Sequence, residues 1–385
     1  MTLYLDYNAT TPVDPRVQAE INRCFSEEWG NAGSPHEFGL RAKALVHAAR
    51  DRIARVVAAR RHDVVFTSGA TESNNLAILG LADHGLATGK RHIVSTQIEH
   101  KAVLEPLAAL SRRGFEITLV PPTPAGRVEV EELLAAVRPE TLLISIMHVN
   151  NETGVIQSIG EIAERLGDCD TKLHIDAAQG FGKEIIPLRH PRIDYISISS
   201  HKIFGPAGIG ALVVRHRKNR PILLSPLMLG GGQELGLRPG TLPVALISGF
   251  GLAAELAHQE SGERKKRCEE IRRQILQAIL PLHPTIHGNL EFALPHVLNV
   301  SFSGLDGEDV VDLLQGIVAV STGSACTSVC ATASHVLAAM HVPQPALDGA
   351  VRFSWGHLST DVQLEETLPR LIDIISKAVR PNAVL

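Results

Sequence analysis

Three short stretches of the sequence combine residue types that can do chemistry. In SGATESNN a small-residue turn leads into a predicted helix, and the backbone N–H groups at such a helix start can bind an anion, with Thr71 adding a hydroxyl. In HIDAAQG, Asp176 ends an apolar run, and a buried aspartate requires a cation or strong donors. In SISSHKIFGP, Lys202 follows another apolar run, a setting that suits an imine-forming amine.

Each of these stretches also has a plain structural interpretation. They can be a capped helix start, an aspartate paired with an arginine, and a solvated lysine at the end of a strand. Taken together they indicate more, because a phosphate cradle, an aspartate at one strand end and a lysine at a later strand end form the layout of a pyridoxal-phosphate enzyme.

Two of the five cysteines, Cys326 and Cys330, lie close together in GSACTSVC. A zinc site would need further ligands, and although His335 is near in the sequence, no fourth ligand is apparent, so we expect no metal. A redox C-x-x-C motif has two intervening residues, whereas this stretch has three. The pattern leaves open a catalytic nucleophile beside a cysteine that fills space.

The elements that position these residues alternate between short apolar runs and helical patterns. The strand candidates are DVVFTS, HIVST, EITLVP, TLLISIMHV, LHIDAA, YISISS and IGALVVR. Several are apolar on both faces, so the pattern predicts an α/β fold with a mostly parallel seven-stranded sheet covered by helices. Later in the chain, HVLNVSFSG and GAVRFSWG predict strands of a smaller α+β domain. We expect a large domain over residues 13–255, and a small domain over residues 1–12 and 256–385 that carries Cys326.

Composition and charge exclude several classes of protein. The 385 residues carry a formal net charge of −4, so no overall basic field favours binding to nucleic acid or to an anionic membrane. The N-terminal stretch MTLYLDYNATTP lacks the basic-then-apolar pattern of an export signal, and no apolar run reaches membrane-spanning length. An odd number of cysteines spread through a long chain is no disulfide framework. We therefore expect a cytoplasmic protein with reduced thiols.

An ordered series of motifs is shared with one known family. The motifs are LDYNATTP, FTSGATESNN, EHKAVL, MHVNNETG, HIDAAQ, SSHKIFGPAGIGAL, LRPGTLP and GSACTS. In these the chain resembles the cysteine desulfurases, a branch of the class V aminotransferases. The likeness runs from about residue 3 to residue 357, and it implies the type I PLP-dependent transferase fold with pyridoxal 5'-phosphate (PLP) as the cofactor.

The resemblance implies roles around the cofactor ring for four residues. Lys202 would hold the cofactor covalently, and Asp176 would pair with the pyridine nitrogen and keep it protonated. Gln179 would lie at the phenolic oxygen. His100 would stack on the ring and assist proton transfers, so that Lys202, His100 and Cys326 would be the catalytic residues.

The resemblance also implies binding sites for the substrate and the phosphate. Asn151 and Arg352 would bind the carboxylate of the substrate, for which a planar guanidinium is well suited because it forms two parallel bonds. The residues implied for the phosphate are Ala70, Thr71, Ser200 and His201, with Thr241 reaching it from the other subunit. This last assignment implies a homodimer.

The activity implied by the resemblance is conversion of L-cysteine to L-alanine. Sulfur would move to the thiolate of Cys326 as a persulfide and then to an acceptor protein. GNAGSPHEFG, LRPGTLP and RFSWGH look most like the branch that supplies sulfur for DNA phosphorothioation. The alternatives are sulfur supply for iron–sulfur clusters or tRNA thiolation, a selenocysteine lyase, and an aminotransferase, which would not need Cys326.

The chain departs from the family pattern in two places. GNAGSPH replaces the commoner G-N-P-S-S-x-H, and SVCATASHVL replaces a more usual Glu-Pro near the end of a long cysteine loop. Neither change touches a residue with an implied chemical role. The second leaves the rest position of the loop and its acceptor contacts open, and the family requires no cysteine at Cys330.

Overall fold

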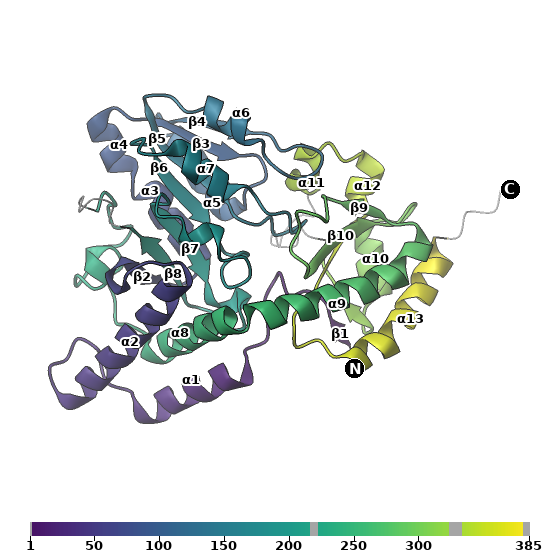
Figure 1. Cartoon of the computed structure of the whole chain (residues 1–385), viewed down its shortest axis with the longest axis horizontal. Coiled ribbons are helices and arrows are strands. Elements are labelled where there is room, and N and C mark those ends of the chain that lie inside the picture. The colour runs from purple at the N-terminus through teal and green to yellow at the C-terminus, as the bar shows by residue number, and fades with distance from the viewer. Residues whose placement is uncertain (1, 216–221, 323–332, 380–385) are drawn as a thin grey trace.

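A seven-stranded sheet forms the centre of the structure, a computed structural model that describes residues 2–215, 222–322 and 333–379 (Figure 1). In spatial order its strands are β2 (Val64–Thr67), β8 (Gly210–Val214), β7 (Tyr195–Ser199), β6 (Lys172–Asp176), β5 (Thr141–Met147), β3 (His92–Thr96) and β4 (Glu116–Val120). Neighbouring strands are parallel except that β8 runs antiparallel to β2 and β7. The predicted mostly parallel seven-stranded sheet is confirmed.

Helices cover both faces of this sheet because its central strands are apolar on both sides. Consecutive residues of β2 show the alternation, since Val64 and Phe66 pack into one buried cluster and Val65 into another. The helices that contribute most to the first cluster are α2 (Glu37–Val56), α7 (Ile159–Leu166) and α8 (Val244–Gln259), with single or paired residues from α1 (Pro15–Glu27) and α6 (Val130–Ala135). Those of the second cluster are α3 (Ala70–Leu79), α4 (Ala82–Thr88) and α5 (Lys101–Ser111).

Beyond α8 the chain forms a separate layer of strands and helices. Its strands are the antiparallel β9 (Thr285–His287), β10 (Val297–Ser301) and β12 (Ala350–Ser354), and the short parallel pair β1 (Leu3–Tyr4) and β11 (Val318–Ala319). Its helices are α9 (Ser261–Ile279), α10 (Gly307–Leu313), α11 (His335–Ala339), α12 (Gln344–Asp348) and α13 (Asp361–Ala378). In Figure 1, α9 and α13 lie side by side over this layer.

A third buried cluster belongs to this second layer. It joins residues of α9, β10, β12 and α13 with Leu3, Leu5 and Tyr7 near the N-terminus. Phe204, which follows β7, also packs into it, so the large sheet and the second layer share a contact region. Residue 255 lies inside α8, and the domain boundaries at 12/13 and 255/256 stay a prediction.

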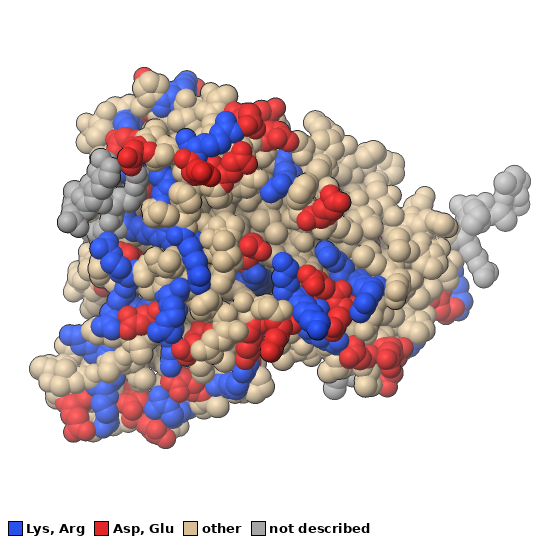
Figure 2. Space-filling model, viewed as in Figure 1, with Lys and Arg blue, Asp and Glu red and all other residues tan. Residues whose placement is uncertain are grey.

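The surface carries charges of both signs. Figure 2 shows lysine and arginine side chains next to aspartate and glutamate side chains over the viewed face, in keeping with the net charge of −4. None of the described helices combines the length and the apolar character that crossing a bilayer requires.

Candidate active site

The carboxyl ends of three strands border a cavity of about 470 Å³. Asp176 is the last residue of β6, and Ser199 ends β7 just before a 3₁₀ turn over Ser200–Lys202. Thr67 ends β2, and α3 begins three residues later. In open α/β sheets ligands bind in the crevice at this edge, so the cavity lies where the fold predicts a ligand site.

Most of the residues expected at the site lie around this one cavity. Those that line it are Ala70, Thr71, His100, Asn151, Asp176, Gln179, His201, Lys202 and Arg352. Ser200 is fully buried and does not line the cavity, and Thr241 is exposed and also lies apart from the lining. Cys326 and Cys330 lie outside the described residues.

The carboxylate of Asp176 is held by two donors. Its Oδ2 accepts a hydrogen bond from Asn74 Nδ2 at 2.8 Å, and its Oδ1 accepts one from the backbone N–H of Ala178 at 2.9 Å. The side chain is only 5% exposed. The carboxylate is therefore fixed in orientation and sheltered from water, as a partner of a buried cationic group needs to be.

The amine of Lys202 meets the N-terminal segment of the chain. Its Nζ donates to the carbonyl oxygen of Ala9 at 2.6 Å and to that of Asn8. The same Asn8 carbonyl accepts a hydrogen bond from Gln179 Nε2 at 3.0 Å. Lys202 and Gln179 are thus joined through one backbone oxygen, although Asn8 lies far from both in the sequence.

Backbone N–H groups at the start of α3 make up the part of the cavity that suits an anion. The first N–H groups of α3, from Ala70 onward, have no helical acceptor because they open the helix. The Oγ of Ser200 is buried and has no hydrogen-bond partner among the described residues. A Cβ at Gly210 would lie 2.6 Å from the Cα of Gly69, so glycine allows β8 to approach this turn closely.

Two histidines, His201 and His100, border the cavity. Burial, with the charges of Lys202 and Lys183 adding to it, lowers the pKa of His201 to about 4, and its Nδ1 lies 3.1 Å from Thr10 Oγ1. His100 caps α5, because its Nδ1 accepts a hydrogen bond from the backbone N–H of Ala102 at 3.0 Å. This bond fixes the orientation of the His100 ring.

Arg352 reaches the cavity from β12 of the second layer. Its Nη1 donates to the carbonyl oxygen of Asn151 at 3.0 Å, and its Nη2 donates to Asp6 Oδ1 at 2.6 Å. The side chain is buried, and Nε has no partner among the described residues. The guanidinium is therefore held in one orientation with a free donor, which suits recognition of a carboxylate.

Comparison with known proteins identifies the family. Residues 3–366 match the aminotransferase class-V family. The chain is also similar to the cysteine desulfurase IscS of Photorhabdus laumondii, with 44% identity over 383 residues that cover 98% of this chain and 93% of the relative. The chain belongs to the cysteine desulfurase family.

Solved structures agree with this membership. The chain is similar to DndA from Streptomyces lividans, with 47% identity, a TM-score of 0.80, and coverage of 90% of this chain and 98% of that one. It is also similar to a structure described as SspA in complex with cysteine, with 36% identity, a TM-score of 0.82, and coverage of 93% and 100%. The cysteine desulfurase family and its type I fold, both expected from the motifs, are confirmed.

Several residues of this cysteine desulfurase site were not singled out in the sequence. Asn74 and Asn8 lie within quoted motifs but received no role, and Asp6 gave no signal as the partner of Arg352. Two buried acids, Glu99 and Glu152, directly precede His100 and follow Asn151. Their positions beside implied site residues are the signal that could have found them.

The two buried acids carry protons more readily than exposed ones. Burial raises the pKa of Glu99 to about 8, against the hydrogen bonds from Thr96 and Met147 that favour the charged form. Burial also raises the pKa of Glu152, whose Oε2 accepts a hydrogen bond from Ser334 Oγ at 2.5 Å.

Within the residues that the structure describes, no group of three or more His, Cys, Asp or Glu side chains could hold a metal ion.

Proposed function

We propose that this protein is a PLP-dependent cysteine desulfurase that converts L-cysteine to L-alanine and carries the released sulfur on Cys326 as a persulfide. The observation that carries the proposal is the convergence of Lys202, Asp176 and Arg352, from three separate strands or strand ends, on one cavity. A family member that had lost this chemistry would not need to keep an amine, a carboxylate and a guanidinium in these places.

The cavity has the donors and acceptors that PLP requires. Asp176 offers a sheltered carboxylate to a protonated ring nitrogen, and the first N–H groups of α3, at Ala70 and Thr71, offer donors to a phosphate. Lys202 offers the amine for covalent attachment. When bound there, the cofactor would supply an electron sink that allows loss of the α-proton of an amino acid.

The residues of the chain would then position the substrate and move its proton. Arg352 and Asn151 bind the carboxylate of L-cysteine, which fixes the α-carbon beside Lys202. The Lys202 amine removes the α-proton, and its contacts with the Asn8 and Ala9 carbonyls define the side from which it acts. The carboxylate of Asp176, held by Asn74 and Ala178, would stabilise positive charge on the group that it faces.

Sulfur transfer is assigned to Cys326. Its thiolate attacks the substrate sulfur, the Cβ–Sγ bond breaks with its electron pair moving to carbon, and protonation of that carbon leads to alanine. The sulfur–sulfur bond formed on Cys326 is the persulfide. A sulfur-acceptor protein or an added thiol then removes this sulfur. Cys330 has no assigned step.

For the fate of the sulfur, we propose DNA phosphorothioation. The motifs GNAGSPHEFG, LRPGTLP and RFSWGH resemble that branch, and the 47% identity with DndA supports it. Sulfur supply for iron–sulfur clusters is the second candidate, because curated IscS relatives are 44% identical over nearly the whole chain. To separate the two, the chain is expressed in a host that lacks the corresponding desulfurase, and DNA phosphorothioates and iron–sulfur enzyme activity are measured.

We also propose that the protein is a homodimer, with Thr241 completing the phosphate site of the partner subunit, and that it is cytoplasmic. Thr241 is exposed and lies apart from the cavity of its own chain. The preceding segment exposes Leu227, Met228 and Leu229, the last of them 90% exposed, and burial of such side chains stabilises an interface. Mixing Lys202→Ala and Thr241→Ala chains tests this, because a mixed dimer regains one intact site and therefore activity.

The main experiment measures products and cofactor separately. The native protein is incubated with L-cysteine and a reductant, and we expect both sulfide and alanine. Cys326→Ser should lose sulfide release and keep the visible absorbance of the bound cofactor, with Cys330→Ser as the matched control that keeps both. Full sulfide release by Cys326→Ser would refute the persulfide assignment. Unchanged absorbance and activity in Lys202→Ala would refute the whole proposal.

A further inference from the structure

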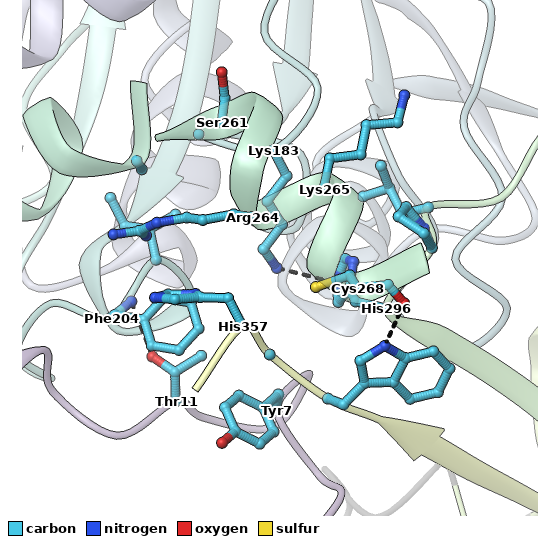
Figure 3. A pocket seen from close by; sticks show the side chains of 17 residues that line it. Tyr7, Thr11, Lys183, Phe204, Ser261, Arg264, Lys265, Cys268, His296 and His357 are labelled. Carbon is cyan, nitrogen blue, oxygen red and sulfur yellow. Dashed lines mark hydrogen bonds between the residues drawn. The ribbon is translucent and has the colours of Figure 1, made fainter. Parts of the chain in front are cut away.

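A second, smaller cavity of about 50 Å³ lies between the large sheet and the second layer (Figure 3). Ile203 and Ala257 of the first buried cluster line it together with Tyr7, Cys268 and Trp355 of the third cluster. A water molecule needs roughly 10–15 Å³ of such space, and a drug-sized ligand needs about 300 Å³ or more. The cavity therefore admits a small ion or a few water molecules.

Lys183 supplies the cationic side chain of this cavity. Figure 3 shows its amine, the sulfur of Cys268 and the ring of His296 pointing toward one another. The Nζ of Lys183 lies 3.2 Å from His296 Nε2 and 3.5 Å from Gln179 Oε1. Lys183 is half-buried between the two cores, and burial together with the nearby charge of Lys202 lowers its pKa to about 7, against the opposite effect of Cys268.

Among the residues that the structure describes, no counter-charge for Lys183 lines the cavity. The residues that line this cavity include neither aspartate nor glutamate. The other cations do not share the role, because Arg264 is bound to Glu260 at 2.8 Å and Lys265 directs its amine away from Lys183 (Figure 3). A partly desolvated ammonium group without a counter-charge is costly, so a bound anion would stabilise the charged form of Lys183.

We propose that this cavity binds a small monovalent anion of the size of chloride against the ammonium group of Lys183. The thiol of Cys268 supplies a second, weaker donor, since burial raises its pKa to about 12 and keeps it protonated. The site is separate from the cavity that holds the catalytic residues, and the inference does not depend on the proposed function.

Occupancy of this site is linked to pH. The titratable or charged groups that line the cavity with Lys183 are His296, Cys268, Arg264, Lys265, His357 and Tyr7, and the charge of Lys202 also acts on Lys183. Burial lowers the pKa of His357 to about 4 and that of His296 well below its ordinary value, so both rings are uncharged near neutrality. Above the pKa of Lys183, anion binding must take up a proton, and the affinity should fall about tenfold per pH unit.

The anion site is also connected to the candidate active site. Lys183 contacts Gln179, Gln179 donates to the Asn8 carbonyl, and that carbonyl accepts a hydrogen bond from Lys202. An anion that keeps Lys183 protonated therefore keeps a positive charge behind Gln179. Above the pKa of Lys183, loss of the anion would leave a neutral amine in the same place.

The direct test is crystallographic and uses the native protein with its cofactor. Crystals grown one pH unit below the pKa of Lys183 are soaked with bromide in place of chloride. We expect an anomalous bromide peak in the cavity at hydrogen-bond distance from Lys183 Nζ. A cavity without such a peak, while bromide occupies surface positions in the same crystal, overturns the proposal.

A solution test uses two matched variants. Chloride should raise the melting temperature relative to gluconate at equal ionic strength, more strongly one pH unit below the pKa of Lys183 than one unit above it. Lys183→Met should abolish this chloride-specific rise, whereas Lys265→Met, an exposed lysine directed elsewhere, should keep it. A chloride response that survives in Lys183→Met also overturns the proposal, and if that variant does not fold, the bromide experiment on the native protein decides.

Discussion

Glu99 is a carboxyl group buried beside the candidate site, and replacing it with glutamine tests whether it holds a proton. Its Oε1 accepts hydrogen bonds from Thr96 Oγ1 at 2.7 Å and from the N–H of Met147 at 2.8 Å, and its Oε2 has no partner among the described residues. Burial raises its pKa to about 8, and the negative charge of Asp176 adds to the effect. We therefore expect Glu99 to be neutral at pH 7.

The difference in pKa between the folded and unfolded states sets the size of the effect. The unfolded chain releases this proton near pH 4.5 and the folded chain near pH 8, so folding takes up a proton between these values. The stabilising contribution is fully present below pH 4.5 and is lost as the pH rises through about 8. At about 1.4 kcal/mol per unit, the loss by pH 7 is about 3 kcal/mol.

Glutamine keeps the acceptor oxygen and has no proton to lose, so Glu99→Gln should not suffer this loss. Relative to the native protein, the free energy of unfolding of Glu99→Gln should rise by about 3 kcal/mol between pH 4.5 and pH 7. Urea unfolding of the cofactor-loaded proteins at several pH values measures this difference. Glu366→Gln, an exposed site on α13, is the control that should show no such trend.

Infrared spectroscopy gives an independent readout of the same proton. The native protein at pH 7 should show the carbonyl stretch of a buried protonated carboxyl group, and Glu99→Gln should lack that band. If the stability difference between the two proteins is the same at pH 5 and pH 7, or if the band is absent from the native protein, the assignment of a neutral Glu99 is wrong.

Two further predictions concern the substrate and the second buried acid. Arg352→Lys should raise the KM for L-cysteine about tenfold or more while the absorbance of the bound cofactor is retained, because an ammonium group cannot form the two parallel bonds of a guanidinium. Steady-state kinetics and absorbance spectra measure these two quantities. An unchanged KM contradicts the role of Arg352. Ser334→Ala should lower the free energy of unfolding by about 1–3 kcal/mol, because it removes a buried hydrogen-bond donor to Glu152 and the N-terminal cap of α11. Urea unfolding measures this change. Ser334→Thr, which retains the hydroxyl, is the control.

The sheet and the position of the ligand site follow directly from the sequence pattern. Runs that are apolar on both faces predict parallel strands covered by helices, and the carboxyl ends of such strands meet at one edge. Because Asp176 and Lys202 each follow such a run, their convergence is predictable from the order of the strands. The same reasoning places the α3 turn beside them, as observed.

The partners of these residues could not be predicted in the same way. Asn8 and Asp6 reach the site through an irregular N-terminal segment. Asn8 contacts Gln179 and Asp6 contacts Arg352, and no periodic pattern in the sequence predicts contacts between residues so far apart. The neutral state of Glu99 depends on complete burial, which arises from packing between α5, β5 and their neighbours. Such long-range contacts are set by tertiary structure and leave no local signal.

Two described residues, one before and one after residues 323–332, are bonded to acids of the candidate site. Ser321 donates from Oγ to Asp6 Oδ1 at 3.1 Å, and the same oxygen accepts the hydrogen bond from Arg352 in the cavity. On the other side, Ser334 is bonded to Glu152 next to Asn151. The described residues before and after 323–332 are therefore both bonded to acids that lie beside the implied substrate-binding residues Asn151 and Arg352.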